Sequence, residues 1–394
     1  MYPSQKKHLL DLWVEYWTQS AYQKFDLFLA RAFKKRPFMG KRDRAWYSEQ
    51  LFTALRFGLL AMDLKTSDEI FKDASMLASK VAKVDENFFD KVEEISKNSQ
   101  NHSDSSFESF SWHPDWIPFF EKSGLDFNRL SNLNTRAPLW LRAKSLADLE
   151  NIKKDLSQRN IEFIVDGLAL KVSGNPKLHE WTSFKMGSFE IQDWASQQIS
   201  LLAPLKKDAL VWDACAGGGG KTLQLSAILE NTGAVIASDV RAFKFDEIKA
   251  RALKARAQNI SCVAWDGRPQ MPNFPQAVSD HGGFDLVLVD APCSSSGTVR
   301  RNPEIKWQSP HLKLRTLSQT QLHILEAVEK SVKTGGHLLY GTCSFLNDEN
   351  EEIAKKFAEK MGARWKFLEF KKLGYSKDND SDLMFAAIFQ KLTK

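Results

Sequence analysis

Five short apolar runs, each ending beside a residue that can do chemistry, constrain the fold of this chain more than any other feature. They are ALVW (209–212), GAVIAS (233–238), SCVAW (261–265), FDLVLV (284–289) and GGHLLYG (335–341), and helical-looking segments separate them. Strands that alternate with helices predict a doubly wound, mostly parallel sheet. The carboxyl ends of such strands share one edge, and ligands bind there at the switch point of the strand order.

Acids and thiols follow the apolar runs. The first four runs are followed by Asp213, Asp239, Asp266 and Asp290, the loop after Asp290 contains Cys293, and the fifth run is followed by Thr342 and Cys343. A single aspartate at a strand end is more often a helix cap than a ligand. Because the pattern repeats after every run, we expect four carboxylates and two thiols to meet in one crevice.

A glycine-rich loop, DACAGGGGKT (213–222), follows the first run. It does not match the phosphate loop of nucleotide hydrolases, because Cys215 stands where the first glycine is required. It does not match the dinucleotide pattern G-x-G-x-x-G either, because Thr222 or Leu223 stands at the third glycine. Four consecutive glycines still allow the backbone to approach a ligand closely.

The acids indicate which ligand this loop holds. An acid at the end of the second strand, the position of Asp239, typically accepts hydrogen bonds from the two hydroxyls of an adenosine ribose. Asp266, after the third strand, is suited to accept from an adenine amino group. S-adenosylmethionine contains adenosine but no phosphate, so we expect the loop to wrap its methionine and ribose part.

The rest of the chain predicts further domains. Residues 1–96 show apolar residues at helical spacing and predict a helical domain. The polar, serine-rich stretch 97–109 predicts a linker, which with a connecting helix extends to residue 130. Residues 187–394 hold the large sheet, to which RWKFLEF (364–370) and LMFAAIFQKL (383–392) add two strands, giving seven.

A small α+β unit is predicted over residues 131–186. PLWLRA (138–143), IEFIVD (161–166) and LALKVSG (168–174) read as strands. Between the first two, Leu146, Leu149, Ile152 and Leu156 form the apolar stripe of a helix. This arrangement is about half of a ferredoxin-like or RNA-recognition-like sheet.

Composition and charge exclude several classes of protein. A hydrophobic content of 43% and a charged content of 26% are those of an ordinary soluble chain, and no apolar run approaches the ~18 residues of a membrane span. The four cysteines lack paired C-x-x-C spacing, so we expect no disulfide framework and no metal. We expect a cytoplasmic monomer without a membrane partner. Basic clusters at 31–44 and 241–256 suit RNA phosphates and solvated helix faces equally well.

The two thiols suggest a specific reaction. Carbon 5 of cytosine becomes nucleophilic only after a thiolate adds to carbon 6, so methylation there needs a cysteine beside the cofactor. Cys293 and Cys343 are the candidates, and buried, inert cysteines are the alternative. Lys221 is expected to help form the thiolate, and Asp290 to hold a ring nitrogen of the base.

A basic segment follows the first of these thiols. We expect Arg300, Arg301 and Lys306 to contact RNA phosphates. Trp307 is available either for stacking on a base or for packing in a protein core, and the sequence leaves both open.

Taken together, these motifs resemble the Sun/RsmB/Nop family of RNA cytosine-C5 methyltransferases, closest to its bacterial 16S rRNA members of the RsmB type. DACAGGGGKT resembles the family's cofactor loop D-x-C-A-A-P-G-G-K-T, DAPCSSSGT its proline-cysteine motif, and YGTCS its threonine-cysteine-serine motif. FEIQDWASQQIS (189–200) resembles the helix that leads into the catalytic domain, and GKRDRAWYSEQLFTALRFG (40–58) resembles the NusB-like RNA-binding domain of bacterial members. The motifs occur in the family's order.

The resemblance implies a Rossmann-like seven-stranded methyltransferase sheet, an RRM-like unit before it, and an N-terminal all-α NusB-like domain. It implies S-adenosylmethionine-dependent methylation of carbon 5 of a cytosine in RNA, with 16S rRNA favoured. A tRNA methyltransferase and a non-catalytic RNA-binding or ribosome-assembly protein remain alternatives.

The resemblance also implies roles for single residues. Cys343 would be the nucleophile and Cys293 would assist release, although the scheme of DNA cytosine methyltransferases would make Cys293 the nucleophile. The cofactor pocket would consist of Cys215, Ala216, Gly217, Gly218, Gly219, Gly220, Lys221, Asp239, Asp266 and Asp290. The sequence departs from the family pattern at Gly217 and Gly218 (usually Ala-Pro), Gly341 (often Ser) and Asn302 (often His). We expect the extra glycines to weaken cofactor affinity, because ordering them costs backbone entropy.

Overall fold

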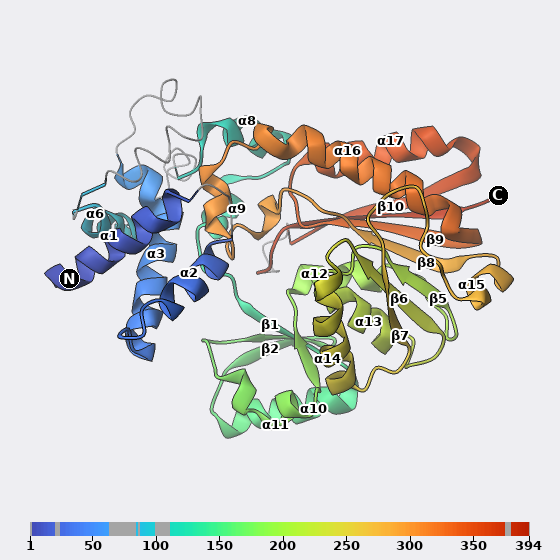
Figure 1. The fold of residues 1–394 in the computed structure, drawn as a ribbon, viewed down its shortest axis with the longest axis horizontal. Helices are drawn as coiled ribbons and strands as arrows, with labels where there is room; N and C mark the ends of the chain where they lie inside the picture. The colour runs from blue at the N-terminus through green and yellow to red at the C-terminus, as the bar shows by residue number, and fades with distance from the viewer. Residues whose placement is uncertain are drawn as a thin grey trace. The chain divides into compact units, whose positions relative to one another are not determined.

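The computed structural model describes residues 2–19, 24–62, 84, 85, 87–98, 111–374 and 380–393. The chain forms two compact units, drawn in Figure 1. The first unit comprises Met1–Arg136 with Thr298–Lys313, and the second comprises Ala137–Gly297 with Leu314–Lys394. Nearly all of the linker predicted at 97–109 lies outside the described residues.

The first unit is helical. Its described helices are α1 (Pro3–Trp17), α2 (Phe25–Lys34), α3 (Lys41–Ala61), α6 (Phe88–Asn98), α8 (Ile117–Lys122) and α9 (Phe127–Leu133). In α2, Phe25, Phe28, Leu29 and Ala32 are buried, which is the spacing of one helix face. These side chains join an aromatic-rich core with Trp13 of α1.

A segment far along the chain completes this helical core. Residues Thr298–Lys313 belong to the first unit, although the sequence predicts them to be part of the sheet domain. Trp307 is buried against Trp13, with ring centroids 5.6 Å apart, and its Nε1 donates to Leu55 O at 2.7 Å. Of the two uses left open for Trp307, the structure shows core packing.

The second unit contains a seven-stranded sheet, so the predicted fold class is confirmed. Its strands are β5 (Leu210–Asp213), β6 (Ala234–Asp239), β7 (Ile260–Ala264), β8 (Phe284–Asp290), β9 (Val332–Thr342), β10 (Trp365–Leu373) and β11 (Met384–Lys391). The order is β10-β11-β9-β8-β5-β6-β7. The strands from β9 to β7 are parallel, and β11 runs antiparallel between β9 and β10. The strand order reverses at β5, which is the switch point.

Helices cover both faces of this sheet (Figure 1). One face packs on α12 (Trp194–Leu201) and α13 (Gly220–Ile228), with α14 (Phe245–Ala255) beside α13. The other packs on α15 (Gln276–Asp280), α16 (His311–Val328) and α17 (Glu351–Met361). In β8, Leu286 and Leu288 face the first layer while Val287 and Val289 face the second. A strand buried on both faces needs the continuous apolar run that the sequence has there.

A four-stranded antiparallel sheet of order β2-β3-β1-β4 lies in the same unit. Its elements are β1 (Leu139–Ala143), α10 (Leu146–Gln158), β2 (Phe163–Asp166), β3 (Ala169–Val172), α11 (Thr182–Lys185) and β4 (Phe189–Ile191). Strand β4 corrects a prediction, because residues 189–191 were assigned to the helix that leads into the catalytic domain. Phe189 pairs with Ala143 of β1, and the helix α12 begins only after Asp193, whose Oδ1 accepts from Ala195 N at 2.9 Å as an N-cap.

Neither a membrane span nor a metal cluster is found in the part of the chain that the structure describes. No helix there is both long enough and apolar enough to cross a bilayer. No three His, Cys, Asp or Glu side chains among the described residues are grouped so that they could hold a metal ion.

Candidate active site at the strand ends

The glycine loop arches over the end of β5 and is tied to the strands on both sides. Ala214 N donates to Leu288 O of β8 at 2.9 Å, and Ala216 N donates to Ser238 O of β6 at 2.8 Å. Gly217 and Gly219 have φ values of 55° and 83°, which glycine adopts without strain. The loop therefore crosses the switch point with its backbone turned sharply enough to start α13 at Gly220.

Asp213 lies beneath this loop. Its side chain is buried, and its Oδ2 accepts from Thr222 Oγ1 of α13 at 2.6 Å. Burial raises the pKa of Asp213 to about 7. Asp213 thus links β5 to α13 inside the protein. The sequence pattern predicted it to face the ligand-binding edge, because the pattern alone does not separate a buried strand-end acid from an accessible one.

Asp239, at the end of β6, contacts the same loop. Its Oδ2 accepts from Gly217 N at 2.9 Å, and its Oδ1 accepts from Arg241 N and Nε at 2.8 and 3.0 Å. Burial opposes ionisation of this carboxyl group, but the donors from Arg241 and Gly217 outweigh it and lower the pKa of Asp239. A ligand hydroxyl at Asp239 must share the carboxylate with the Arg241 side chain, which is 55% exposed.

A cavity of about 430 Å³ opens beside β6 and β7. It is lined by Asp239, Val240, Ala264, Trp265, Asp266, Arg268, Gln270, Met271, Pro272 and Asn273. Its size is that of a small-molecule site. A lining that mixes apolar and polar side chains, with one acid from each of two strand ends, suits a flat heterocycle joined to a ribose. The two acids predicted to bind adenosine, Asp239 and Asp266, therefore face one cavity.

An ion pair stands at the next strand end. Lys221 Nζ of α13 lies 2.8 Å from Asp290 Oδ2 at the end of β8. Burial disfavours the Lys221 ammonium, but Asp290 outweighs burial and raises the pKa of Lys221. The lysine therefore remains a cation, and its charge also acts on Cys343.

The two thiols predicted to act together are in contact. Cys293 Sγ lies 3.3 Å from Cys343 Sγ, and Ser295 Oγ lies 3.5 Å from Cys343 Sγ. The hydrogen bond from Cys293 is the main cause that lowers the pKa of Cys343, with Ser295 and Lys221 adding to it. The same hydrogen bond, with burial, raises the pKa of Cys293. The contact thus lowers the pKa of Cys343 and raises the pKa of Cys293.

A buried glutamate that the sequence reasoning missed holds the loop around Cys293. Glu349 Oε1 accepts from Ser294 N at 2.8 Å and from Gln321 Nε2 at 3.0 Å, and its Oε2 accepts from Ser294 Oγ at 2.5 Å. Gln321 Nε2 also donates to Pro292 O at 3.0 Å. The only signal in the sequence was that Glu349 lies in the segment that contains Cys343.

Two of the three predicted RNA contacts are corrected. Lys306 is 0% exposed, and its Nζ donates to Arg56 O and Ser111 Oγ, both at 2.9 Å, and to Asn134 Oδ1. Arg300 is 5% exposed and donates to Arg136 O at 2.7 Å. This burial contradicts a phosphate contact for both residues. Arg301 is exposed, and its contact with RNA stays a prediction.

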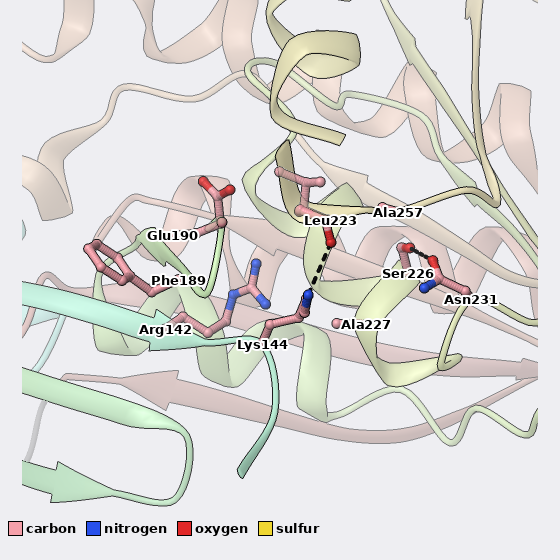
Figure 2. A pocket seen from close by; sticks show the side chains of 11 residues that line it. Arg142, Lys144, Phe189, Glu190, Leu223, Ser226, Ala227, Asn231 and Ala257 are labelled. Atoms are coloured by element: carbon pink, nitrogen blue, oxygen red, sulfur yellow. Dashed lines mark hydrogen bonds between the residues drawn. The ribbon is translucent and has the colours of Figure 1, made fainter. Parts of the chain in front are cut away.

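A second cavity, shown in Figure 2, lies between the small sheet and the helices α13 and α14. Arg142, Lys144 and Glu190 line it from the small sheet, and Lys144 Nζ donates to Ala255 O of α14 at 3.2 Å. Its volume of about 30 Å³ has room for about one water molecule. It is therefore too small for a ligand the size of adenosine.

A known family matches the part of the chain that contains this edge of the sheet. Residues 199–387 match the family described as 16S rRNA methyltransferase RsmB/F. This segment is therefore similar to the RsmB/F methyltransferases. The matched segment contains the glycine loop, the Lys221–Asp290 pair and both thiols.

The similarity to curated relatives covers only part of each chain. Ribosomal RNA small subunit methyltransferase B of Proteus mirabilis is 30% identical over 261 residues, which are 63% of this chain and 59% of that protein. The probable ribosomal RNA small subunit methyltransferase B of Bacillus subtilis is 34% identical over 176 residues, 45% of this chain and 38% of that protein. The chain thus matches less than two thirds of the length of these relatives.

Solved structures share the fold of this protein. The protein PH0851 superposes with a TM-score of 0.74 and 20% identity over 99% of both chains. NSun6 from Pyrococcus horikoshii, solved with SFG, has a TM-score of 0.59 and 16% identity over 74% of this chain and 98% of that chain. At these identities the likeness establishes the fold alone.

Proposed function

We propose that this protein transfers a methyl group from S-adenosylmethionine to carbon 5 of a cytosine in RNA, with 16S rRNA as the substrate. The observation that carries the proposal is the contact between Cys293 and Cys343, whose Sγ atoms are 3.3 Å apart. The names of the curated relatives support ribosomal RNA as the substrate class. With this substrate, we expect the protein to act in the cytoplasm.

The residues present suit S-adenosylmethionine. Asp239 and Asp266 line a cavity of about 430 Å³ and would hold the ribose and the adenine. Residues 215–221 would hold the methionine part, and a related protein, NSun6, was solved with SFG. The bound cofactor supplies an electrophilic methyl group.

Cys343 begins the chemistry on the base. Its thiolate forms a bond to carbon 6. The electron pair of the carbon 5–carbon 6 double bond shifts to the carbon 4–carbon 5 bond while the ring nitrogen takes up a proton, which gives an enamine whose carbon 5 is nucleophilic. The Lys221–Asp290 pair holds the proton that the ring nitrogen takes up in this step. A fixed hydrogen-bond donor in a site that excludes water also stabilises the charge that develops on the ring.

Release of the product reverses the first step. A solvent base takes the proton from carbon 5, the electrons of that C–H bond re-form the carbon 5–carbon 6 double bond, and the bond from carbon 6 to sulfur breaks, so that Cys343 departs with the electron pair. Cys293 lies 3.3 Å from that sulfur and keeps its proton, so it can protonate the departing sulfur. The opposite pKa shifts of the two thiols support Cys343 as the nucleophile, and weigh against the DNA-methyltransferase scheme.

The test uses the wild type, Cys343→Ala and Cys293→Ala with methyl-labelled S-adenosylmethionine and unmodified small-subunit rRNA. We expect Cys343→Ala to form neither 5-methylcytidine nor a covalent adduct, and Cys293→Ala to accumulate adduct. Cys262→Ala, a half-buried cysteine in β7, is the matched control and should behave as wild type.

Two outcomes would overturn the proposal. Methylation by wild type of tRNA but not of rRNA, naked or assembled, would make the substrate tRNA. A wild-type protein that binds RNA but methylates none of these substrates would be an RNA-binding or assembly protein instead.

A further inference from the structure

One arginine connects the glycine loop to the small sheet. Arg251, on α14, donates from NH1 to Gly218 O, and its Nε and NH2 donate to Glu190 Oε2 at 3.1 and 2.8 Å. Glu247 Oε1 lies 3.8 Å from the same NH1. Since Glu190 is on β4, a single guanidinium connects the glycine loop, α14 and the small sheet.

A second arginine reaches the loop from the small sheet itself. Arg142 of β1 is buried, donates from Nε to Gln192 Oε1 at 2.6 Å, and has NH2 3.5 Å from Gly220 O. Burial lowers the pKa of Arg142 to about 10, so the guanidinium is still charged at neutral pH. The carbonyls of Gly218 and Gly220 therefore both point at cations on this side of the loop.

Holding the Gly218 carbonyl orients the rest of the loop. A peptide group is planar and trans, so the N–H of Gly219 points opposite to the Gly218 carbonyl. That N–H donates to Ala216 O at 2.8 Å, and the neighbouring Gly217 N donates to Asp239. Arg251 thus fixes a turn whose other anchor is the acid proposed to hold the cofactor ribose.

The absence of a side chain at residue 218 makes room for this contact. A Cβ on Gly218 would lie 2.9 Å from Glu247 Oε1 and 3.3 Å from Arg251 NH1. The family pattern has Ala-Pro at residues 217 and 218, and a proline restricts its own backbone. The four glycines of this chain do not restrict the backbone in this way. Arg251 instead restrains the loop by donating a hydrogen bond to the Gly218 carbonyl.

We propose that Arg251 is a positioning residue for the cofactor loop and that Glu190 holds Arg251 in place. The small sheet then contributes to cofactor affinity through Glu190 without touching the cofactor. This inference rests on the proposed function, because it takes S-adenosylmethionine as the ligand of the loop.

The experiment measures S-adenosylmethionine binding by calorimetry and methyl transfer at steady state. Arg251→Ala should raise the Kd and the KM for S-adenosylmethionine by about tenfold, the effect of one lost charge-assisted hydrogen bond, with kcat changed less than about twofold. Arg251→Lys should recover part of the affinity, because an ammonium reaches one acceptor but lacks the fork. Glu190→Gln should weaken binding less, and adding it to Arg251→Ala should cause no further loss.

Lys249→Ala, which removes an exposed cation from the same helix, is the matched control and should bind as wild type. An unchanged Kd and KM in Arg251→Ala overturns the inference, as do additive effects of Arg251→Ala and Glu190→Gln. If Arg251→Ala fails to fold, Arg251→Lys and Glu190→Gln decide, and wild-type affinity in both overturns it. Wild type that binds no S-adenosylmethionine refutes the proposed cofactor instead, which keeps the two failures distinct.

Discussion

In this site, two residues of the same type can have pKa values shifted in opposite directions, because their surroundings differ. Asp213 and Asp239 end adjacent strands, yet burial raises the pKa of Asp213 to about 7 while donors from Arg241 and Gly217 lower the pKa of Asp239. In the same way, the pKa of Cys293 is raised while the pKa of Cys343 is lowered. At the scale of the residue, neighbours and not residue type distinguish the proposed nucleophile from Cys293, and the structural carboxyl group of Asp213 from Asp239.

Replacing Asp213 by asparagine tests this at the residue scale. The folded-state pKa of Asp213 is raised from 3.8 to about 7, so the folded protein binds this proton more tightly than the unfolded chain. Its contribution to stability is complete below pH 3.8 and is lost as the pH rises to about 7. The substituted asparagine side chain does not titrate. The free energy of unfolding of Asp213→Asn relative to wild type should therefore rise by about 2 to 3 kcal/mol from pH 5 to pH 8.

Urea unfolding at the two pH values measures this difference. Asp280→Asn, at an exposed position, is the control and should show a much smaller change. An equal difference between Asp213→Asn and wild type at pH 5 and pH 8 would mean that Asp213 is not held in its neutral form.

At the scale of the element, the loop after β8 keeps its shape through contacts with α16 and with the segment after β9. Glu349 accepts three hydrogen bonds there from Ser294 and Gln321. Gly297 is required at the end of the same loop, because a Cβ would lie 1.8 Å from Leu383 O. The position of Cys293 relative to Cys343 therefore depends on residues that do not touch the base.

Glu349→Ala is expected to destabilise the protein by about 2 to 4 kcal/mol, because it removes the charged acceptor of three hydrogen bonds from Ser294 and Gln321. It should also slow adduct formation on RNA, since Ser294 is next to Cys293. Urea unfolding and the adduct assay measure the two effects. Glu359→Ala, on the exposed side of α17, is the matched control, and a loss of stability in Glu349→Ala no larger than in that control would contradict the assigned role.

At the scale of the whole molecule, the chain does not divide at a single point. Residues 298–313 pack in the helical unit, although sheet elements precede and follow them in the sequence. Trp307 and Lys306 are among the side chains that this segment buries there. The basic segment predicted to contact RNA is for this reason mostly interior, and only Arg301 among the three predicted residues is exposed.

Arg301 and Lys306 should therefore respond differently to mutation. Arg301→Ala should weaken RNA binding and lower the slope of log affinity against log salt by about one, as expected for one lost phosphate contact. Lys306→Met should leave the slope unchanged but cost about 2 to 4 kcal/mol of stability, because it leaves buried acceptors unsatisfied. Filter binding at several salt concentrations and urea unfolding separate the two. A lowered slope in Lys306→Met with normal stability would restore the original prediction.

By itself, the sequence determined the seven strands, the helical N-terminal segment and the motifs at the strand ends. These follow from local patterns, since a strand buried on both faces needs a continuous apolar run and a close turn needs glycine. The tertiary structure alone decided which side chains meet. It brought Cys293 to 3.3 Å from Cys343, placed Glu349 beneath Ser294, and buried Lys306. It also turned residues 189–191 into a strand, because pairing with β1 is non-local. Burial and partners far apart in the chain set these outcomes, and no local pattern carries that information.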